Sequence, residues 1–73
     1  MMNHGVKQIN QLFPMRLKKL RLNRRVPMSD ICYHTRISQA TLYRYEQGND
    51  PKLSHVIEIA QYFKVSLEDL TGY

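Results

Sequence analysis

The side chains best suited to chemistry in this sequence lie in one short stretch, residues 38–48. Ser38 can cap the start of a helix and Gly48 can end one in the left-handed conformation, with no glycine or proline between them. At about 100° per residue, one side of this helix carries Leu42 and Tyr45 and can be buried. The other side carries no negative charge, and its residues are Gln39, Ala40, Tyr43 and Arg44. Such a surface is suited to recognition through hydrogen bonds.

Residue sets typical of catalysis or of metal sites are missing from the sequence. His4, His34 and His55 are scattered and lack metal-ligand spacing with the single cysteine, Cys32. No Ser-His-acid set, glycine-rich phosphate loop or paired carboxylate of a cleft is found. We therefore expect no enzyme, no metal and no cofactor.

Charge is divided unevenly along the 73 residues, which are enough for one small domain. The net charge is +5, but residues 15–45 carry +7 and residues 46–73 carry −3. Six basic residues and no acid lie within residues 16–25, so this segment cannot form ion pairs within its own helix. One basic face and an anionic partner are expected.

The apolar residues do not form a membrane-spanning run. No stretch approaches the roughly 18 apolar residues that a spanning helix requires, and the first residues lack a signal-peptide core. The single cysteine excludes an internal disulfide. These features favour a cytoplasmic protein without a membrane partner.

The apolar periodicity predicts an all-α domain of five short helices. The first is expected over residues 14–24, with Pro14 in its first turn and Met15, Leu17 and Leu20 facing the core. Residues 1–12 are expected to form a partly mobile N-terminal arm, and residues 13–71 the domain. Alternatively, Val6 and Ile9 form a turn or two of helix against the body.

Four further helices follow the same pattern. They are expected over residues 28–34, 38–48, 53–63 and 67–71, with Ser66 capping the last and Gly72 ending it. The inward positions of the helix at 53–63 are expected to be Leu53, Val56, Ile57, Ala60 and Phe63.

Two short helices joined by a three-residue turn form a helix-turn-helix unit. Here the sequence resembles the Cro and lambda-repressor-like (XRE-type) helix-turn-helix family. The matching segments are RLKKLR, SDICYHTRISQATLYRYEQG and PKLSHVIEIAQYFKVSLEDL. The resemblance implies a compact five-helix DNA-binding domain whose helices 2 and 3 form the helix-turn-helix.

The resemblance also implies residue roles. Arg21 and Glu46 match an arginine and a glutamate that pair in relatives and hold the recognition helix in place. The groove-facing positions match Ser38, Gln39, Ala40, Tyr43 and Arg44, and Gln47 matches a polar residue that contacts phosphate.

The chain departs from the family pattern at helix boundaries. Pro27 and Met28 replace the usual Thr or Ser and Gln, so a phosphate contact is expected to be missing, with Ser29 capping a later start. Three positions where relatives often carry glycine at a helix end are basic instead: Arg25, Arg36 and Lys64.

Each exposed residue of the recognition helix has alternative roles. Arg44 can bond O6 and N7 of guanine, or it can contact phosphate. Gln39 can bond adenine, and Tyr43 can touch a thymine methyl or a phosphate. Base reading is therefore expected from Gln39, Ala40, Tyr43 and Arg44.

Phosphate contacts are expected mainly from charges outside that helix. Some of these charges could instead be only solvated. The set is Ser38, Arg21, Lys18, Lys19, Arg24, Arg25, Arg36 and Gln47.

The leading hypothesis is a sequence-specific, repressor-like transcriptional regulator that binds double-stranded DNA as a homodimer on inverted half-sites. Leu67, Leu70 and Tyr73 are the expected dimer contacts. The alternative is a small antitoxin or accessory module that binds a protein partner. RNA binding is less favoured, because no stacking platform is evident.

Overall fold

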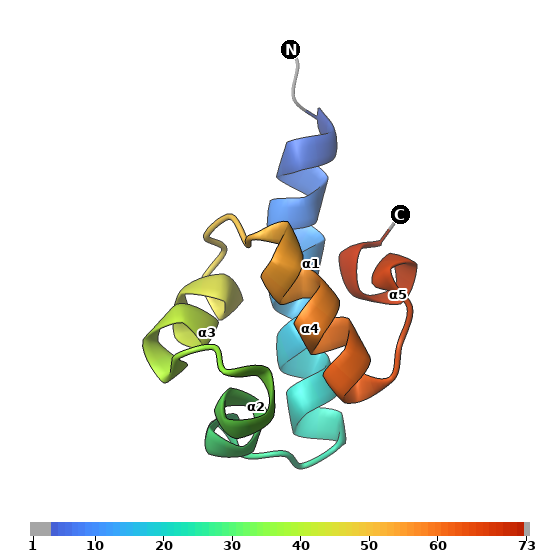
Figure 1. Ribbon diagram of the computed structural model, residues 1–73. Coiled ribbons are helices and arrows are strands. Elements are labelled where there is room, and N and C mark those ends of the chain that lie inside the picture. Colours follow the sequence, from blue (N-terminus) through green and yellow to red (C-terminus); the bar gives the residue numbers. More distant parts are fainter. Residues whose placement is uncertain (1–3, 73) are drawn as a thin grey trace.

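Residues 4–72 of the protein form five α-helices, as a computed structural model shows (Figure 1). It describes the backbone of residues 4–72 and the side chains of residues 12–72. No strand occurs within residues 4–72, so the expected all-α class is confirmed. The helices are α1 (His4–Asn23), α2 (Met28–Thr35), α3 (Gln39–Glu46), α4 (Leu53–Phe63) and α5 (Leu67–Thr71).

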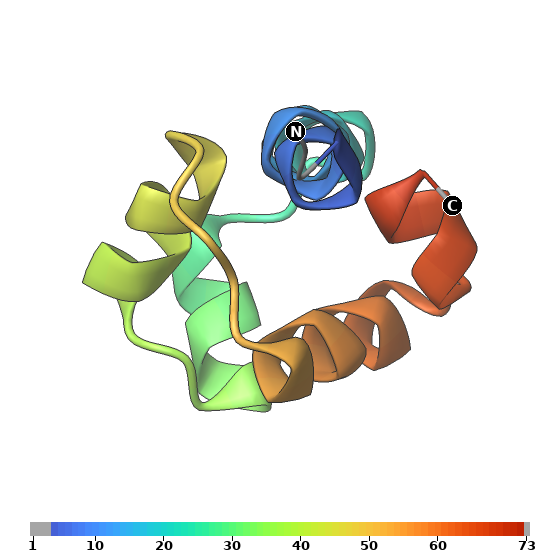
Figure 2. The same cartoon turned by 90° about the horizontal axis from the view of Figure 1, so that it is seen from above.

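Helix α1 is the axis of the domain, and the other helices are arranged beside it. Seen from above, α3 and α5 lie on opposite sides of α1, while α4 lies across the core from it (Figure 2). Helices α2 and α3 lie next to each other on one side of the domain, and the N-terminal half of α1 extends beyond the other helices (Figure 1). Side chains on different sides of α1 therefore face different surfaces.

The first helix begins at His4, so the expected start at Pro14 is wrong. Pro14 lies in the helix interior, where it lacks the N–H that would bond to residue 10. It is buried between Phe13 and Leu17, which are 0% and 1% exposed. Burial of this apolar side offsets the lost hydrogen bond. The expected packing of Val6 and Ile9 lies outside the described side chains.

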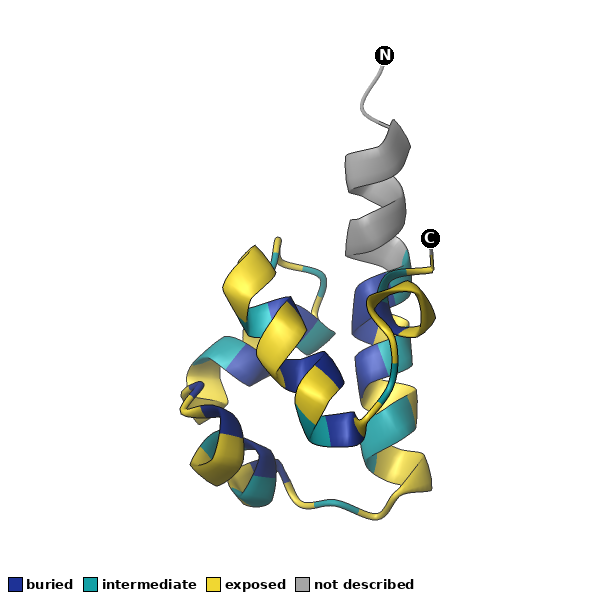
Figure 3. Ribbon diagram, turned by 45° about the vertical axis from the view of Figure 1, so that its right-hand side comes forward, coloured by how far each residue is buried: buried dark blue, intermediate teal, exposed yellow. Residues whose placement is uncertain are grey.

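The core consists of one continuous apolar cluster. Buried positions recur along α1 and α4 between exposed ones (Figure 3). Met15 is 58% exposed, so its expected place in the core is wrong. The members are Phe13, Leu17, Met28, Ile31, Ile37, Leu42, Tyr45, Val56, Ile59, Ala60, Phe63 and Leu70.

Helix α4 has the expected bounds but a different inward side. Leu53 and Ile57 are exposed, whereas Ile59 is fully buried. Val56, Ile59, Ala60 and Phe63 keep helical spacing, and this side, rotated from the expected one, faces the core in a helix that packs against α2 and α5. The expected inward positions at Leu53 and Ile57 are wrong.

The C-terminal helix contributes one residue to the core. Leu70 is fully buried, so its expected role as a dimer contact is wrong. Leu67 is 42% exposed, and Tyr73 lies outside the described residues. Ser66 accepts a hydrogen bond from the N–H of Asp69 at 2.9 Å, which confirms the expected cap.

Three helix ends use basic residues in the left-handed conformation. Their φ angles are 54° at Arg25, 61° at Arg36 and 58° at Lys64. Each costs about 1 kcal/mol relative to glycine. The turns are nevertheless well bonded, since the N–H groups of Val26 and Val65 each reach a carbonyl five residues back at 3.0 Å.

Candidate nucleic-acid interface

Helix α3 has a defined start and a defined end. The Oγ of Ser38 accepts a hydrogen bond from the N–H of Thr41 at 3.2 Å and is 2.8 Å from the Thr41 hydroxyl. At the other end Gly48 has a φ of 107°, and the N–H of Asn49 donates to the carbonyl of Arg44 at 3.0 Å. Both ends match the sequence prediction.

The turn between α2 and α3 is fixed by a threonine that the sequence prediction missed. The Thr35 hydroxyl donates to the carbonyl of Ile31 at 2.7 Å and accepts from the N–H of Ile37 at 3.3 Å. Ile37 and Ile31 are 2% and 0% exposed. The turn is thus held by an apolar anchor and a buried hydroxyl, so α3 is set at a fixed angle to α2. A threonine at a helix C-terminus, before a buried residue, is the local signal for this role.

One side of α3 is buried against the rest of the domain. Leu42 is 0% exposed and Tyr45 is 5% exposed, and the Tyr45 ring meets Phe13 edge to face with centroids 5.9 Å apart. The Tyr45 hydroxyl accepts from the N–H of Lys52 at 3.3 Å and lies 2.6 Å from Nδ1 of His55. These contacts join α3 to α4 and to the residue that precedes it.

An ion pair joins the C-terminal end of α3 to α1. Arg21 Nε donates to Glu46 Oε2 at 2.8 Å, and Nη2 donates to Oε1 at 3.0 Å. The side chains are 18% and 8% exposed. The hydrogen bond to Glu46 raises the pKa of Arg21 further above its ordinary value. The pairing implied by the resemblance is confirmed, and it occupies two of the five N–H groups of Arg21.

A family model described as "Helix-turn-helix" matches residues 17–70, well over half of the chain. The chain belongs to this family, that of the Cro and lambda-repressor-like domains. The family is one of DNA-binding regulators. Comparison with curated proteins and with solved structures finds no match to the chain.

Within the helix-turn-helix, the expected base-reading side of α3 faces outward. Gln39, Ala40, Tyr43 and Arg44 are all exposed. Among residues 12–72, none of these four side chains forms a hydrogen bond or ion pair. The four are therefore free to meet a ligand while Leu42 and Tyr45 hold the helix from behind.

The expected phosphate-binding residues do not all lie on one surface. Lys19 lines a hollow of about 300 Å³ with Val65 and Asp69, which places it toward α5. Arg24 donates from Nη1 to the backbone carbonyl of Phe63 at 2.7 Å. The carbon of its guanidinium lies 5.7 Å from the centroid of the Phe63 ring. Since α3 and α5 are on opposite sides of α1, Lys19 lies away from the side of α3 (Figure 2). Arg24 is engaged by α4.

Of the remaining expected phosphate residues, Arg21 is only partly exposed and the others are exposed. Arg25 and Arg36 follow α1 and α2, while Ser38 and Gln47 flank α3. Lys18 is exposed on α1, one helical turn before Arg21.

The N-terminus of α2 differs from the expected cap. The helix begins at Met28, which is 7% exposed, and its N-cap is Pro27 with no side-chain hydrogen bond. Ser29 is inside the helix, so its expected role as the cap is wrong. An apolar, buried Met28 offers no polar group to a phosphate.

A hollow beside Arg44 brings in two residues that the sequence prediction did not consider. It has a volume of about 330 Å³, and Lys52 and His55 form part of its wall with Arg44, Asn49 and Asp50. Lys52 is the N-cap of α4, and the first turn of that helix has no acidic residue. The hollow therefore has a positive balance at the edge of the exposed side of α3.

Metal and membrane features are not found in the part of the chain that the structure describes. There, no group of three or more His, Cys, Asp or Glu side chains is placed to hold a metal ion. No described helix is both long and apolar enough to cross a membrane. Burial raises the pKa of the Cys32 thiol, which disfavours its reactive thiolate form.

Proposed function

We propose that this protein is a sequence-specific DNA-binding transcriptional regulator of the repressor type, which places α3 in the major groove. The observation that carries the proposal is the exposed, unpaired set Gln39, Ala40, Tyr43 and Arg44 on a helix that is fixed from behind. A regulator of this kind acts by occupying its operator, so it requires a positioned surface and no chemical step.

In the proposed complex, Arg44 bonds the N7 and O6 of a guanine, and Gln39 bonds an adenine. Tyr43 and Ala40 contact the groove nearby, where a thymine methyl fits an apolar surface. The two helix-holding contacts support this arrangement, because base discrimination requires donors and acceptors held in a fixed position.

The phosphate contacts are proposed to come from residues around α3. Ser38 and Gln47 lie at its two ends, and Arg36 precedes it. Arg21 has N–H groups beyond the two that bind Glu46. Lys18 and Arg25 complete this set, whereas Lys19 and Arg24 are placed or engaged elsewhere and are left out of it.

We further propose that two copies bind inverted half-sites about one helical turn apart, as is common for this class. Leu67 is the one expected dimer contact that is exposed within the described residues.

Selection of bound DNA from a random duplex pool, at stated salt, tests the proposal. A motif with two inverted halves is the expected result. Recovery of duplexes without any common motif, with affinity that depends on salt alone, would contradict sequence-specific regulation and would favour the accessory-module alternative.

A further inference from the structure

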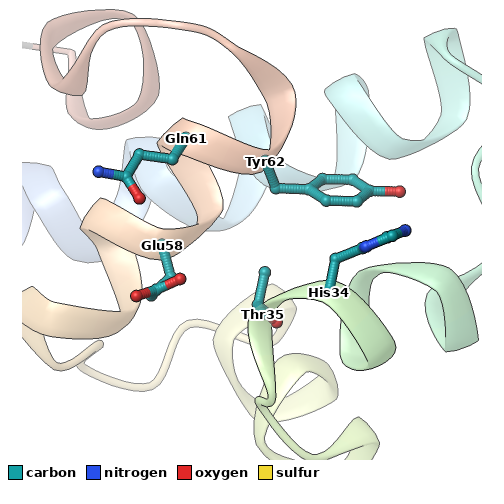
Figure 4. A pocket seen from close by; sticks show the side chains of 5 residues that line it. All are labelled: His34, Thr35, Glu58, Gln61 and Tyr62. Atoms are coloured by element: carbon teal, nitrogen blue, oxygen red, sulfur yellow. The ribbon is translucent and has the colours of Figure 1, made fainter.

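A hollow of about 400 Å³ lies between α2 and α4, away from the DNA-binding residues proposed above. Its wall is formed by His34, Thr35, Glu58, Gln61 and Tyr62 (Figure 4). Among the described side chains, none from α3 or α1 contributes to it. A ligand bound in this α2–α4 pocket would therefore leave the exposed side of α3 free.

Aromatic rings form one side of the α2–α4 pocket. His34 and Tyr62 have centroids 5.6 Å apart with planes inclined by 35°. Tyr33 meets His34 edge to face at 5.1 Å and is 80% exposed, whereas Tyr62 meets the buried ring of Phe63 at 4.9 Å. The rings thus extend from the core to the surface.

Carboxylates flank these rings. The Tyr62 hydroxyl donates to Asp30, whose other oxygen is 3.6 Å from His34 Nε2. Glu58 is exposed and, among the described side chains, forms neither an ion pair nor a hydrogen bond. In Figure 4, Glu58 and Gln61 lie on one side of Thr35, and Tyr62 with His34 on the other.

Among the residues that the structure describes, no lysine or arginine lines the pocket, although the chain as a whole is basic. The wall therefore combines aromatic faces with the Glu58 carboxylate, and Asp30 lies beside the rings. Positive charge is attracted both to the face of an aromatic ring and to a carboxylate. The missing component is a cation from outside the chain.

We propose that the α2–α4 pocket binds an arginine side chain presented by a partner protein. A guanidinium is planar, so it can stack against the Tyr62 and His34 rings while its fork of N–H groups bonds the Glu58 carboxylate. A lysine ammonium lacks the plane and the fork, and it is more strongly hydrated, so it fits this combination less well. The pocket gives a protein partner a docking point that does not involve the exposed side of α3.

The proposal is tested first with a minimal probe, N-acetyl-arginine amide, titrated into the isotope-labelled protein and followed by amide NMR shifts. The expected result is saturable binding on the order of 1 mM, as for a ligand of this size. The largest shifts are expected at His34, Thr35, Glu58, Gln61 and Tyr62. N-acetyl-lysine amide is expected to bind more weakly, and the neutral isostere N-acetyl-citrulline amide not at all.

A matched pair of variants separates this site from general attraction to acidic surface. Glu58→Gln is expected to weaken arginine binding at least about tenfold, the loss of one charge-assisted bidentate contact. Glu68→Gln removes the same charge from the exposed surface of α5 and should leave the affinity unchanged. Equal effects of the two variants would overturn the proposal.

A third variant tests the aromatic side without disturbing the core. His34 is half exposed, so His34→Ala should reduce arginine binding while the protein stays folded, as its amide NMR spectrum would show. Shifts of equal size with arginine and citrulline, or no shifts up to tens of millimolar arginine, would also overturn the proposal. Because none of these measurements uses DNA, their outcome is independent of the proposed regulator function.

Discussion

Arg21 of α1 and Glu46 of α3 form a two-bond ion pair, with distances of 2.8 and 3.0 Å, at the C-terminal end of the recognition helix. Tyr45, the residue before Glu46, is tied to the other side of the domain through His55 and the N–H of Lys52. The end of α3 is therefore held from two directions. Its exposed side can change position only if one of these connections breaks.

Glu46→Ala should lower the free energy of unfolding by about 1–3 kcal/mol, because Arg21 then keeps its charge at an 18% exposed position without a partner. Urea denaturation measures this loss. In a double-mutant cycle with Arg21→Ala, the coupling energy should be about 1 kcal/mol or more. Lys18→Ala, an exposed change on the same helix, should alter stability by less than about 0.5 kcal/mol. A coupling energy near zero would show that the pair does not hold α3.

Tyr45→Phe should lower the free energy of unfolding by about 1–2 kcal/mol, although the ring contact with Phe13 is kept. The cause is the loss of the hydroxyl that accepts from the N–H of Lys52 and is hydrogen-bonded to Nδ1 of His55. Thermal or urea unfolding provides the measurement. Tyr43→Phe is the matched control, since the Tyr43 hydroxyl is exposed and its removal should leave stability unchanged. If both variants lose the same stability, the contact contributes nothing specific.

Much of this fold could be predicted from local sequence signals. The caps at Ser38 and Ser66 and the helix end at Gly48 depend on neighbouring residues alone, and all three are confirmed. The left-handed conformations of Arg25 and Arg36 were implied by the family pattern, because that pattern places glycine there.

What could not be predicted depends on contacts between distant segments. Local sequence predicts a helix start at Pro14, but burial of Phe13 and Leu17 allows the helix to run through this proline. Ile57 and Ile59 are both apolar, and only the position of α4 against α2 and α5 decides which of them is buried. The contact between Tyr62 and Asp30 joins residues 32 positions apart, and no local pattern indicates it.

Tyr62 should titrate at a higher pH than is usual for a tyrosine. Burial, together with its hydrogen bond to Asp30, raises its pKa to about 12 from the usual 10. A raised pKa in the folded state means that this group stabilises the fold fully below pH 10, and that its contribution is lost as the pH rises from about 10 to 12. NMR of ring-labelled tyrosine should show the late titration, and Asp30→Asn should lower the pKa of Tyr62. An unchanged value in Asp30→Asn would assign the shift to burial alone.

The left-handed helix ends allow stability to be separated from DNA binding. Both Lys64→Gly and Arg36→Gly should stabilise the fold by about 0.5–1 kcal/mol, since each relieves a positive φ angle. Arg36 is also a proposed phosphate contact, whereas Lys64 lies at the far end of α4. Arg36→Gly should therefore weaken DNA binding and reduce the salt slope by about 1, while Lys64→Gly should not. Equal DNA affinities of the two variants would remove Arg36 from the interface.

A variant of Arg44 distinguishes the two roles open to its exposed side chain on α3, base reading and phosphate contact. If it reads a guanine, Arg44→Ala should cost about 1–3 kcal/mol on the selected operator and relax the preference at one base position. If it contacts phosphate, the same variant should weaken all duplexes alike and reduce the salt slope by about 1. Binding measured at several salt concentrations, on the operator and on duplexes changed at single positions, separates these outcomes. Lys19→Ala is the matched control, because that cation lies toward α5, and its removal should change neither the preference nor the slope.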